Sequence, residues 1–177
     1  MINLPVWNLK DFYPDYKSKK VLEDIVSLDK KAKKFNTKYK TKLKKLDYKD
    51  LELSIKEFEK IEEKSQFIHS FAFLTYCTDQ TNEDKSKFFQ DIEEKINNIQ
   101  MNLVFFTIEI NKLSKNKAEF QKKSKYQSWL KNLFKNKKYQ KPEAVEKILM
   151  EKSITSSSSW IKFFDQFMAR LRFKYRG

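Results

Sequence analysis

A single histidine limits the metal and acid–base chemistry that this chain could perform. His69 lies in the segment Phe67-Ile68-His69-Ser70-Phe71, so a zinc site, a histidine pair or a catalytic triad would depend on one imidazole. The sequence has no H-E-x-x-H motif, which places two imidazoles one helical turn apart with a glutamate as general base. We therefore interpret His69 as a structural or surface residue. We expect no catalytic residue, no metal ligand and no cofactor-binding residue in this chain.

Paired carboxylates are the second group that could perform acid–base work or bind a divalent cation. The pairs are Glu62 with Glu63, Glu93 with Glu94, and Asp91 with Glu94. Adjacent side chains point about 100° apart on a helix. Each pair also has lysines nearby in the sequence. We interpret all of them as solvated ion pairs on helix surfaces.

Glu109 and Cys77 are isolated residues of the same reactive types. Glu109 lies in the apolar run Phe105-Phe106-Thr107-Ile108-Glu109-Ile110, and a buried carboxylate needs a partner. We expect it to form an interhelical ion pair or hydrogen bond rather than to act in catalysis. Cys77 is the only cysteine, so it cannot form a disulfide within the chain. We interpret it as a small buried residue and expect a reducing, cytoplasmic compartment.

The near absence of glycine and proline determines which elements can position these residues. The only glycine is Gly177, and neither residue type occurs between Lys17 and Lys141. This excludes the glycine-rich loops that bind nucleotide phosphates. It also favours long helices, because no residue in that stretch enforces a break.

Apolar residues at three- and four-residue spacing predict three long helices within residues 18–115. The first begins at the N-cap Ser18 and continues through Leu46, with its apolar positions at Leu22, Ile25, Leu28 or Ala32, Phe35, Tyr39, Leu43 and Leu46. The second follows the cap-type aspartates Asp47 and Asp50. The third has a heptad seam from Phe88 to Leu113 and follows a turn at Thr78-Asp79-Gln80-Thr81-Asn82.

The remaining segments complete an all-α domain that spans residues 1–177. Residues 1–17 hold two prolines and several aromatic residues, which predicts a docked N-terminal arm. Residues 116–177 predict shorter helices, one around Phe120 to Phe134 and one with Pro142 in its first turn. The serine run from Ser153 to Ser159 predicts a turn and cap before an aromatic helix that begins at Trp160. The expected architecture is a bundle of long antiparallel amphipathic helices followed by shorter C-terminal helices.

The net charge of +14 raises a polyanion as a partner. Only three of the 38 basic residues are arginine, and the lysines alternate with glutamates, as on solvated helix faces. We expect a lysine-rich surface rather than a nucleic-acid site, and most aromatic residues lie on the apolar stripes that predict a core. A stand-alone basic module that binds nucleic acid or another polyanion remains the alternative function. No run of about 18 apolar residues is present, so we expect no membrane partner.

The order of several motifs resembles that of the oligoendopeptidase F family of thimet-oligopeptidase-like zinc metallopeptidases. The opening Trp7-Asn8-Leu9-Lys10-Asp11-Phe12-Tyr13 resembles the motif that begins family members, and Thr78 to Asn82 resembles the family's Thr-Asp-x-Thr-Asn turn. Further matches are Phe35 to Tyr39, Phe105 to Ile110, Pro142 to Leu149, Lys152 to Thr155, Ser159-Trp160, Phe164-Asp165 and Leu171-Arg172-Phe173. The chain departs from the family pattern at Ser156, where a glycine is common, and at Gln166, where glutamate is common.

The resemblance implies a role without chemistry in this chain. It covers nearly the whole chain and about the first third of a family member, and it implies that the zinc ligands and catalytic glutamate lie beyond the position of Gly177. The implied function is that of the N-terminal helical lobe of a zinc metalloendopeptidase that hydrolyses short oligopeptides. This lobe would shape the substrate channel against a catalytic domain, supplied in cis or by a separate chain. Peptidase activity and zinc binding are expected of the full-length enzyme alone.

Overall fold

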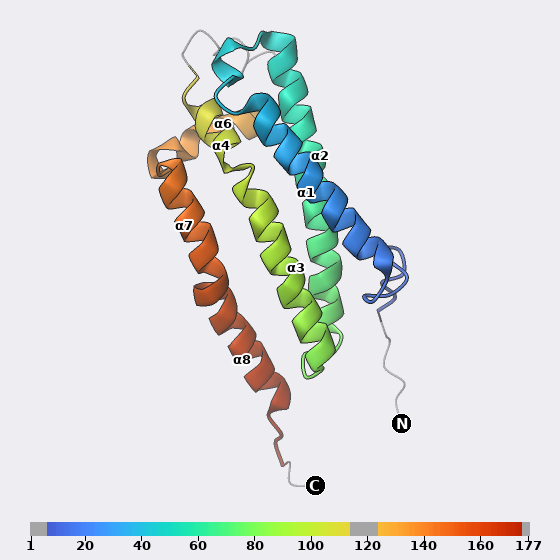
Figure 1. The fold of residues 1–177 in the computed structure, drawn as a ribbon. Coiled ribbons are helices and arrows are strands. Elements are labelled where there is room, and N and C mark those ends of the chain that lie inside the picture. Colours follow the sequence, from blue (N-terminus) through green and yellow to red (C-terminus); the bar gives the residue numbers. More distant parts are fainter. Residues whose placement is uncertain (1–6, 114–123, 175–177) are drawn as a thin grey trace.

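The computed structural model describes residues 7–113 and 124–174, and every regular element within these ranges is helical. The α-helices are α1 (Lys19–Tyr39), α2 (Tyr48–Cys77), α3 (Glu83–Met101), α4 (Val104–Asn111), α6 (Gln127–Asn136), α7 (Glu143–Ser153) and α8 (Ser159–Arg170). Short 3₁₀ turns at Leu43–Lys45 and Lys137–Tyr139 and a π-helical turn at Ile154–Ser158 complete the order. Among the long helical runs α1, α2, α3 and α7–α8, each run after the first lies antiparallel to the one before it in the chain, which confirms the expected all-α bundle (Figure 1).

The three long helices begin at the polar residues that the sequence marks as caps. Ser18 accepts a hydrogen bond from the backbone N–H of Lys20 at the start of α1. Asp47 accepts one from Asp50 at the start of α2, at 2.8 Å, and Asn82 starts α3 in the same way. Each side chain satisfies a backbone N–H that has no partner within the helix. The three predicted helix starts are confirmed.

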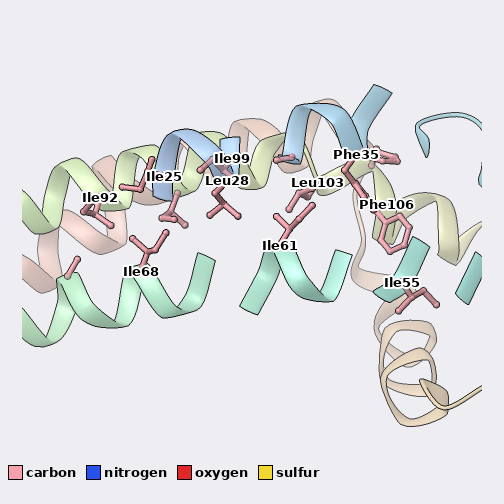
Figure 2. Close-up of a cluster of buried hydrophobic side chains, with 14 of the residues drawn as sticks. Ile25, Leu28, Phe35, Ile55, Ile61, Ile68, Ile92, Ile99, Leu103 and Phe106 are labelled. Atoms are coloured by element: carbon pink, nitrogen blue, oxygen red, sulfur yellow. The ribbon is translucent and has the colours of Figure 1, made fainter. Parts of the chain in front are cut away.

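The core lies where α1, α2 and α3 pack together, and it is aromatic at the end near α4. Phe35 of α1, Phe58 of α2 and Phe106 of α4 are in mutual ring contact, with centroids 4.8 to 6.1 Å apart. Figure 2 shows Phe35 and Phe106 at one end of a row of buried aliphatic side chains. On α1 the buried face begins at Val21, whereas Leu22, which we expected on this face, is 53% exposed.

The described part of the N-terminal arm lies on α2. The ring of Phe12 contacts Phe67 at 5.0 Å, and Tyr13 is buried against Phe71. The Tyr13 hydroxyl donates to Asp24 Oδ2 at 2.7 Å, and Lys64 Nζ donates to the same oxygen at 2.6 Å. These contacts attach the arm to both α1 and α2.

The first helix ends earlier than the apolar spacing predicts. Helix α1 stops at Tyr39 instead of Leu46, because Thr41 adopts a positive φ of 67° that a right-handed helix cannot contain. The backbone N–H of Thr41 donates to Glu109 Oε1 at 2.8 Å, so a side chain from α4 holds this break.

The predicted third helix is divided in two. Its heptad seam continues to Leu113, yet α3 ends at Met101 and α4 begins at Val104. The side-chain amide of Asn36 on α1 donates to the carbonyl of Asn102 at 2.7 Å. This carbonyl is thereby bound outside the helical ladder, and the seam bends at that point.

The serine run is helical, so the predicted turn between α7 and α8 is wrong. Residues Ile154–Ser158 form a π-helical turn that joins the two helices into one straight rod, visible beside α3 in Figure 1. The hydroxyls of Ser156, Ser157 and Ser159 donate to carbonyls four or five residues earlier, at 2.6, 3.4 and 2.7 Å. Serine is tolerated within this helix because its hydroxyl finds a partner in the preceding turn. Pro142 lies directly before α7, at its N-cap position rather than within its first turn.

The helix expected around Phe120 to Phe134 is only partly within the described residues. Helix α6 begins at Gln127 and ends at Asn136, and Phe120 lies outside the described ranges. Leu130 is its buried anchor in the core.

Candidate functional site

Helix α8 attaches to the bundle through its polar side. Lys162 Nζ donates to Gln90 Oε1 of α3 at 3.0 Å, and Gln166 Nε2 donates to Ser86 Oγ at 2.8 Å. With Asp165 and Ala169, these half-buried positions recur at three- and four-residue steps, so they form one face of α8. Burial lowers the pKa of Lys162, and the nearby carboxylates of Glu93 and Asp91 act in the opposite direction.

The opposite face of α8 carries the aromatic residues and is exposed. Trp160 is 71% exposed, Phe163 61% and Phe167 54%, and Phe163 contacts both of the others through its ring. We call this surface the outer apolar face; it comprises Trp160, Ile161, Phe163, Phe164, Phe167 and Met168 of α8. Helix α7 adds the exposed residues Val145, Ile148 and Leu149. Exposed apolar patches of large area are typical of interaction sites.

The carboxylate pairs have the expected surroundings only in part. Glu63 is exposed to solvent, as we expected, whereas Glu62 is half-buried, and within the described part of the chain no ion pair involves either residue. Both line a cavity between α2 and α6. Burial raises the pKa of Glu62, and a hydrogen bond with Gln100 acts in the opposite direction. Glu94 is exposed on α3.

Glu109 forms the interhelical hydrogen bond that we expected. It accepts from the Thr41 backbone N–H beyond the end of α1, which gives it a structural role. Cys77 is half-buried rather than fully buried. Burial is the main cause that raises the pKa of its thiol, and the negative charge of the nearby Asp165 adds to it. His69 is half-buried, with its ring edge-on to Phe89 at a centroid distance of 5.7 Å.

The described side chains do not suit a zinc ion. Among residues 7–113 and 124–174, no three His, Cys, Asp or Glu residues are grouped so that they could hold a metal. Zinc in proteins is held by three or four such ligands at one point. We therefore assign no metal-dependent step to these residues.

Lysines gather in a groove between α1 and α2. Five of them line a cavity of about 370 Å³, namely Lys31, Lys34, Lys38, Lys60 and Lys64. Lys38 pairs with Glu57 at 2.7 Å, and Lys64 pairs with Asp24 at 2.6 Å. We call this surface the lysine groove. The sequence predicts a lysine-rich surface in general terms and does not single out this groove, because lysines from two helices meet there.

The described residues form a helical bundle with an exposed apolar face on α8. A family model described as Oligopeptidase F, for the N-terminal domain of these peptidases, matches residues 107–173. That match supports the resemblance to the N-terminal domain of the oligoendopeptidase F family over this part of the chain. It includes α7, α8 and the outer apolar face, whereas the motifs before residue 107 lie outside it.

Two other comparisons gave no match. Neither a curated protein nor a solved structure matches the chain. In addition, none of the described helices combines the length and apolar composition needed to traverse a lipid bilayer.

Proposed function

We propose that this chain serves as the non-catalytic N-terminal lobe of an oligoendopeptidase F-type zinc metallopeptidase in the cytoplasm. The catalytic, zinc-binding part would be supplied in cis or by a separate chain. The single observation that carries the proposal is the family match at residues 107–173, which includes the outer apolar face. A covering partner would remove this apolar surface from water, at roughly 25 cal/mol per Å².

The proposed role is to form one wall of the channel that leads to the catalytic centre. Beside this wall, the groove between α3 and α8 has a volume of about 300 Å³; serine, amide, Glu93 and Lys162 side chains line it, together with the apolar side chains of Ile154 and Phe163. A wall made of rigid helices restricts access to unfolded oligopeptides through its shape, while the partner performs metal-assisted hydrolysis.

The proposal is tested by association with an oligoendopeptidase F-type catalytic segment from the same organism, measured by analytical ultracentrifugation. We expect a one-to-one complex with this chain. The double variant Phe163→Asp/Phe167→Asp should abolish the complex, because it places charges in the outer apolar face. The matched control is Leu22→Asp/Val26→Asp, which changes two residues that are each 53% exposed on α1. The proposal fails if the native chain does not associate, or if both double variants weaken association equally.

The lysine groove supports a second candidate function, the binding of a polyanion. Only two of its five lysines form ion pairs within the described part of the chain. Phosphate binding by lysines weakens steeply with salt, because binding releases counterions. Fluorescence anisotropy with a labelled single-stranded oligonucleotide, at low and moderate salt, tests this function. The triple variant Lys31→Gln/Lys34→Gln/Lys60→Gln should remove binding. Absence of binding by the native chain at low salt would eliminate this function.

A further inference from the structure

An aromatic cavity lies beside α2 where α4 and α6 meet it. It has a volume of about 730 Å³, within the range of pockets that bind small ligands. Its walls include Phe58 and Trp129, whose ring centroids are 6.1 Å apart, and Ile55 contributes apolar surface. We call it the aromatic cavity.

The charges of the aromatic cavity are opposite to that of the whole chain. Glu59, Glu62 and Glu63 line it, and among residues 7–113 and 124–174 no lysine or arginine does so. The chain as a whole has a net charge of +14. At the edge of the cavity Lys125 lies over the ring of Tyr126, and Glu59 is among the groups that raise the pKa of Lys125.

Glu62 is half-buried, and none of the described residues forms an ion pair with it. Burial raises its pKa, while the hydrogen bond with Gln100 favours the charged form. A carboxylate in such a place is stabilised by a cation that enters the site. Glu59 is already oriented, since Tyr126 donates its hydroxyl to Glu59 Oε2 at 3.0 Å.

The combination of aromatic rings and carboxylates selects the kind of cation. A metal cation such as Ca²⁺ prefers oxygen ligands on most sides, which the aromatic walls do not supply. An ammonium or guanidinium group gains both from the faces of aromatic rings and from charge-assisted hydrogen bonds to carboxylates. The residues therefore suit an organic cation.

A second cavity adjoins the aromatic cavity, so a molecule that extends beyond its cationic group could contact both. Glu62 and Gln66 line both the aromatic cavity and a second cavity of about 360 Å³ between α2 and α3. Asn97 and Gln100 contribute amide groups to the second cavity. Amide side chains both donate and accept hydrogen bonds, as a peptide backbone requires.

We propose that the aromatic cavity binds the basic side chain of an extended peptide, whose backbone continues past Gln66 into the amide-lined cavity. This inference needs only residues of this chain. Its failure would therefore leave the proposed association with a catalytic part unaffected.

Isothermal titration calorimetry with two peptides tests the proposal. The probe is acetyl-Ala-Arg-Ala-Ala-amide, and its control carries neutral, isosteric citrulline in place of arginine. We expect the arginine peptide to bind at least about tenfold more tightly than the citrulline peptide, because only arginine forms charge-assisted hydrogen bonds with the carboxylates. Equal binding of the two peptides, or no binding of either, would overturn the proposal. Equal affinity for free arginine amide would overturn the peptide part of it.

Variants and a spectroscopic readout separate binding from folding. Glu62→Gln and Trp129→Phe should each weaken the arginine peptide about tenfold or more, whereas the exposed control Glu94→Gln should not. By NMR, the pKa of Glu62 should fall when the arginine peptide is added, because a nearby cation favours the carboxylate. An unchanged Glu62 pKa in the presence of bound peptide would contradict the proposed site.

Discussion

The substitutions Phe106→Ala and Phe163→Ala should have very different effects on stability, although they delete the same side chain. Phe106 has no exposed surface and contacts Phe35 and Phe58 through its ring. Phe163 is 61% exposed on α8. The pair therefore measures directly whether the aromatic residues of α8 lie outside the core of this chain.

The expected magnitudes follow from burial. Loss of a fully buried phenylalanine leaves a cavity and costs about 3–5 kcal/mol. Burial of a whole side chain of this kind contributes roughly 1.5–3 kcal/mol. Because only about two fifths of the Phe163 surface is buried, its removal should cost a corresponding fraction of that, about 1 kcal/mol. A difference of at least about 2 kcal/mol between the two variants is expected.

Urea unfolding, monitored by circular dichroism, measures the free energy of unfolding of both variants. A loss of stability lowers the urea concentration at the midpoint, while the dependence of the free energy on urea concentration stays constant if the folded state remains compact. The reasoning is refuted if Phe163→Ala costs as much as Phe106→Ala. That result would mean that α8 turns its aromatic face inward in solution.

Three further predictions concern single positions. Thr41→Gly should raise the free energy of unfolding by about 1 kcal/mol, because Thr41 has a φ of 67° that costs a β-branched residue roughly this amount; a loss in urea unfolding would contradict it. Ser157→Ala should leave stability unchanged or slightly higher, whereas Ser157→Gly should lower it by about 1 kcal/mol relative to the alanine variant, because the serine run is helical; equal thermal midpoints would restore the predicted turn. Glu62→Gln should stabilise the chain at pH 7 and not at pH 3. The pKa of Glu62 is higher in the folded state than in the unfolded state. The protein is therefore not destabilised by Glu62 at a pH below the unfolded-state pKa, and it loses stability as the pH rises from about pH 4 and the buried carboxyl group ionises. A pH-independent difference between the two proteins in urea unfolding would exclude this cause.

Local chemistry accounts for what the sequence could predict of the fold. Ser18, Asp47 and Asn82 begin their helices through hydrogen bonds that span only two or three residues. Apolar spacing likewise identified the helices of the core, because the period of a helix is a local property.

The helix ends that we predicted wrongly depend on contacts between distant residues. The bond from Thr41 to Glu109 spans 68 positions, and the bond from Asn36 to Asn102 spans 66. Periodicity continued through both breaks because it records only which side of a helix is apolar. The prediction for the serine run was wrong for another reason, since a serine hydroxyl can also bond to a carbonyl one turn earlier and so be tolerated within a helix.

The candidate sites depend on how whole helices are placed. The aromatic spacing of α8 predicted an apolar face and could not reveal that Lys162 and Gln166 attach the opposite face to α3. Similarly, Glu62 looked solvated in the sequence, whereas α6 brings Trp129 and Tyr126 to the same cavity. Such juxtapositions arise from tertiary packing, so residue types in one segment do not predict them.

The central claim is that this chain completes a peptidase when a catalytic partner covers the outer apolar face of α8. Restoration of peptidase activity on mixing the two components would test this claim most directly. An oligoendopeptidase F-type catalytic segment from the same organism, combined with this chain, should hydrolyse a quenched fluorescent oligopeptide that neither component hydrolyses alone. The Phe163→Asp/Phe167→Asp variant should not restore this hydrolysis, whereas Leu22→Asp/Val26→Asp should. Hydrolysis that is unchanged by the addition of this chain, or equal restoration by both variants, would contradict the account.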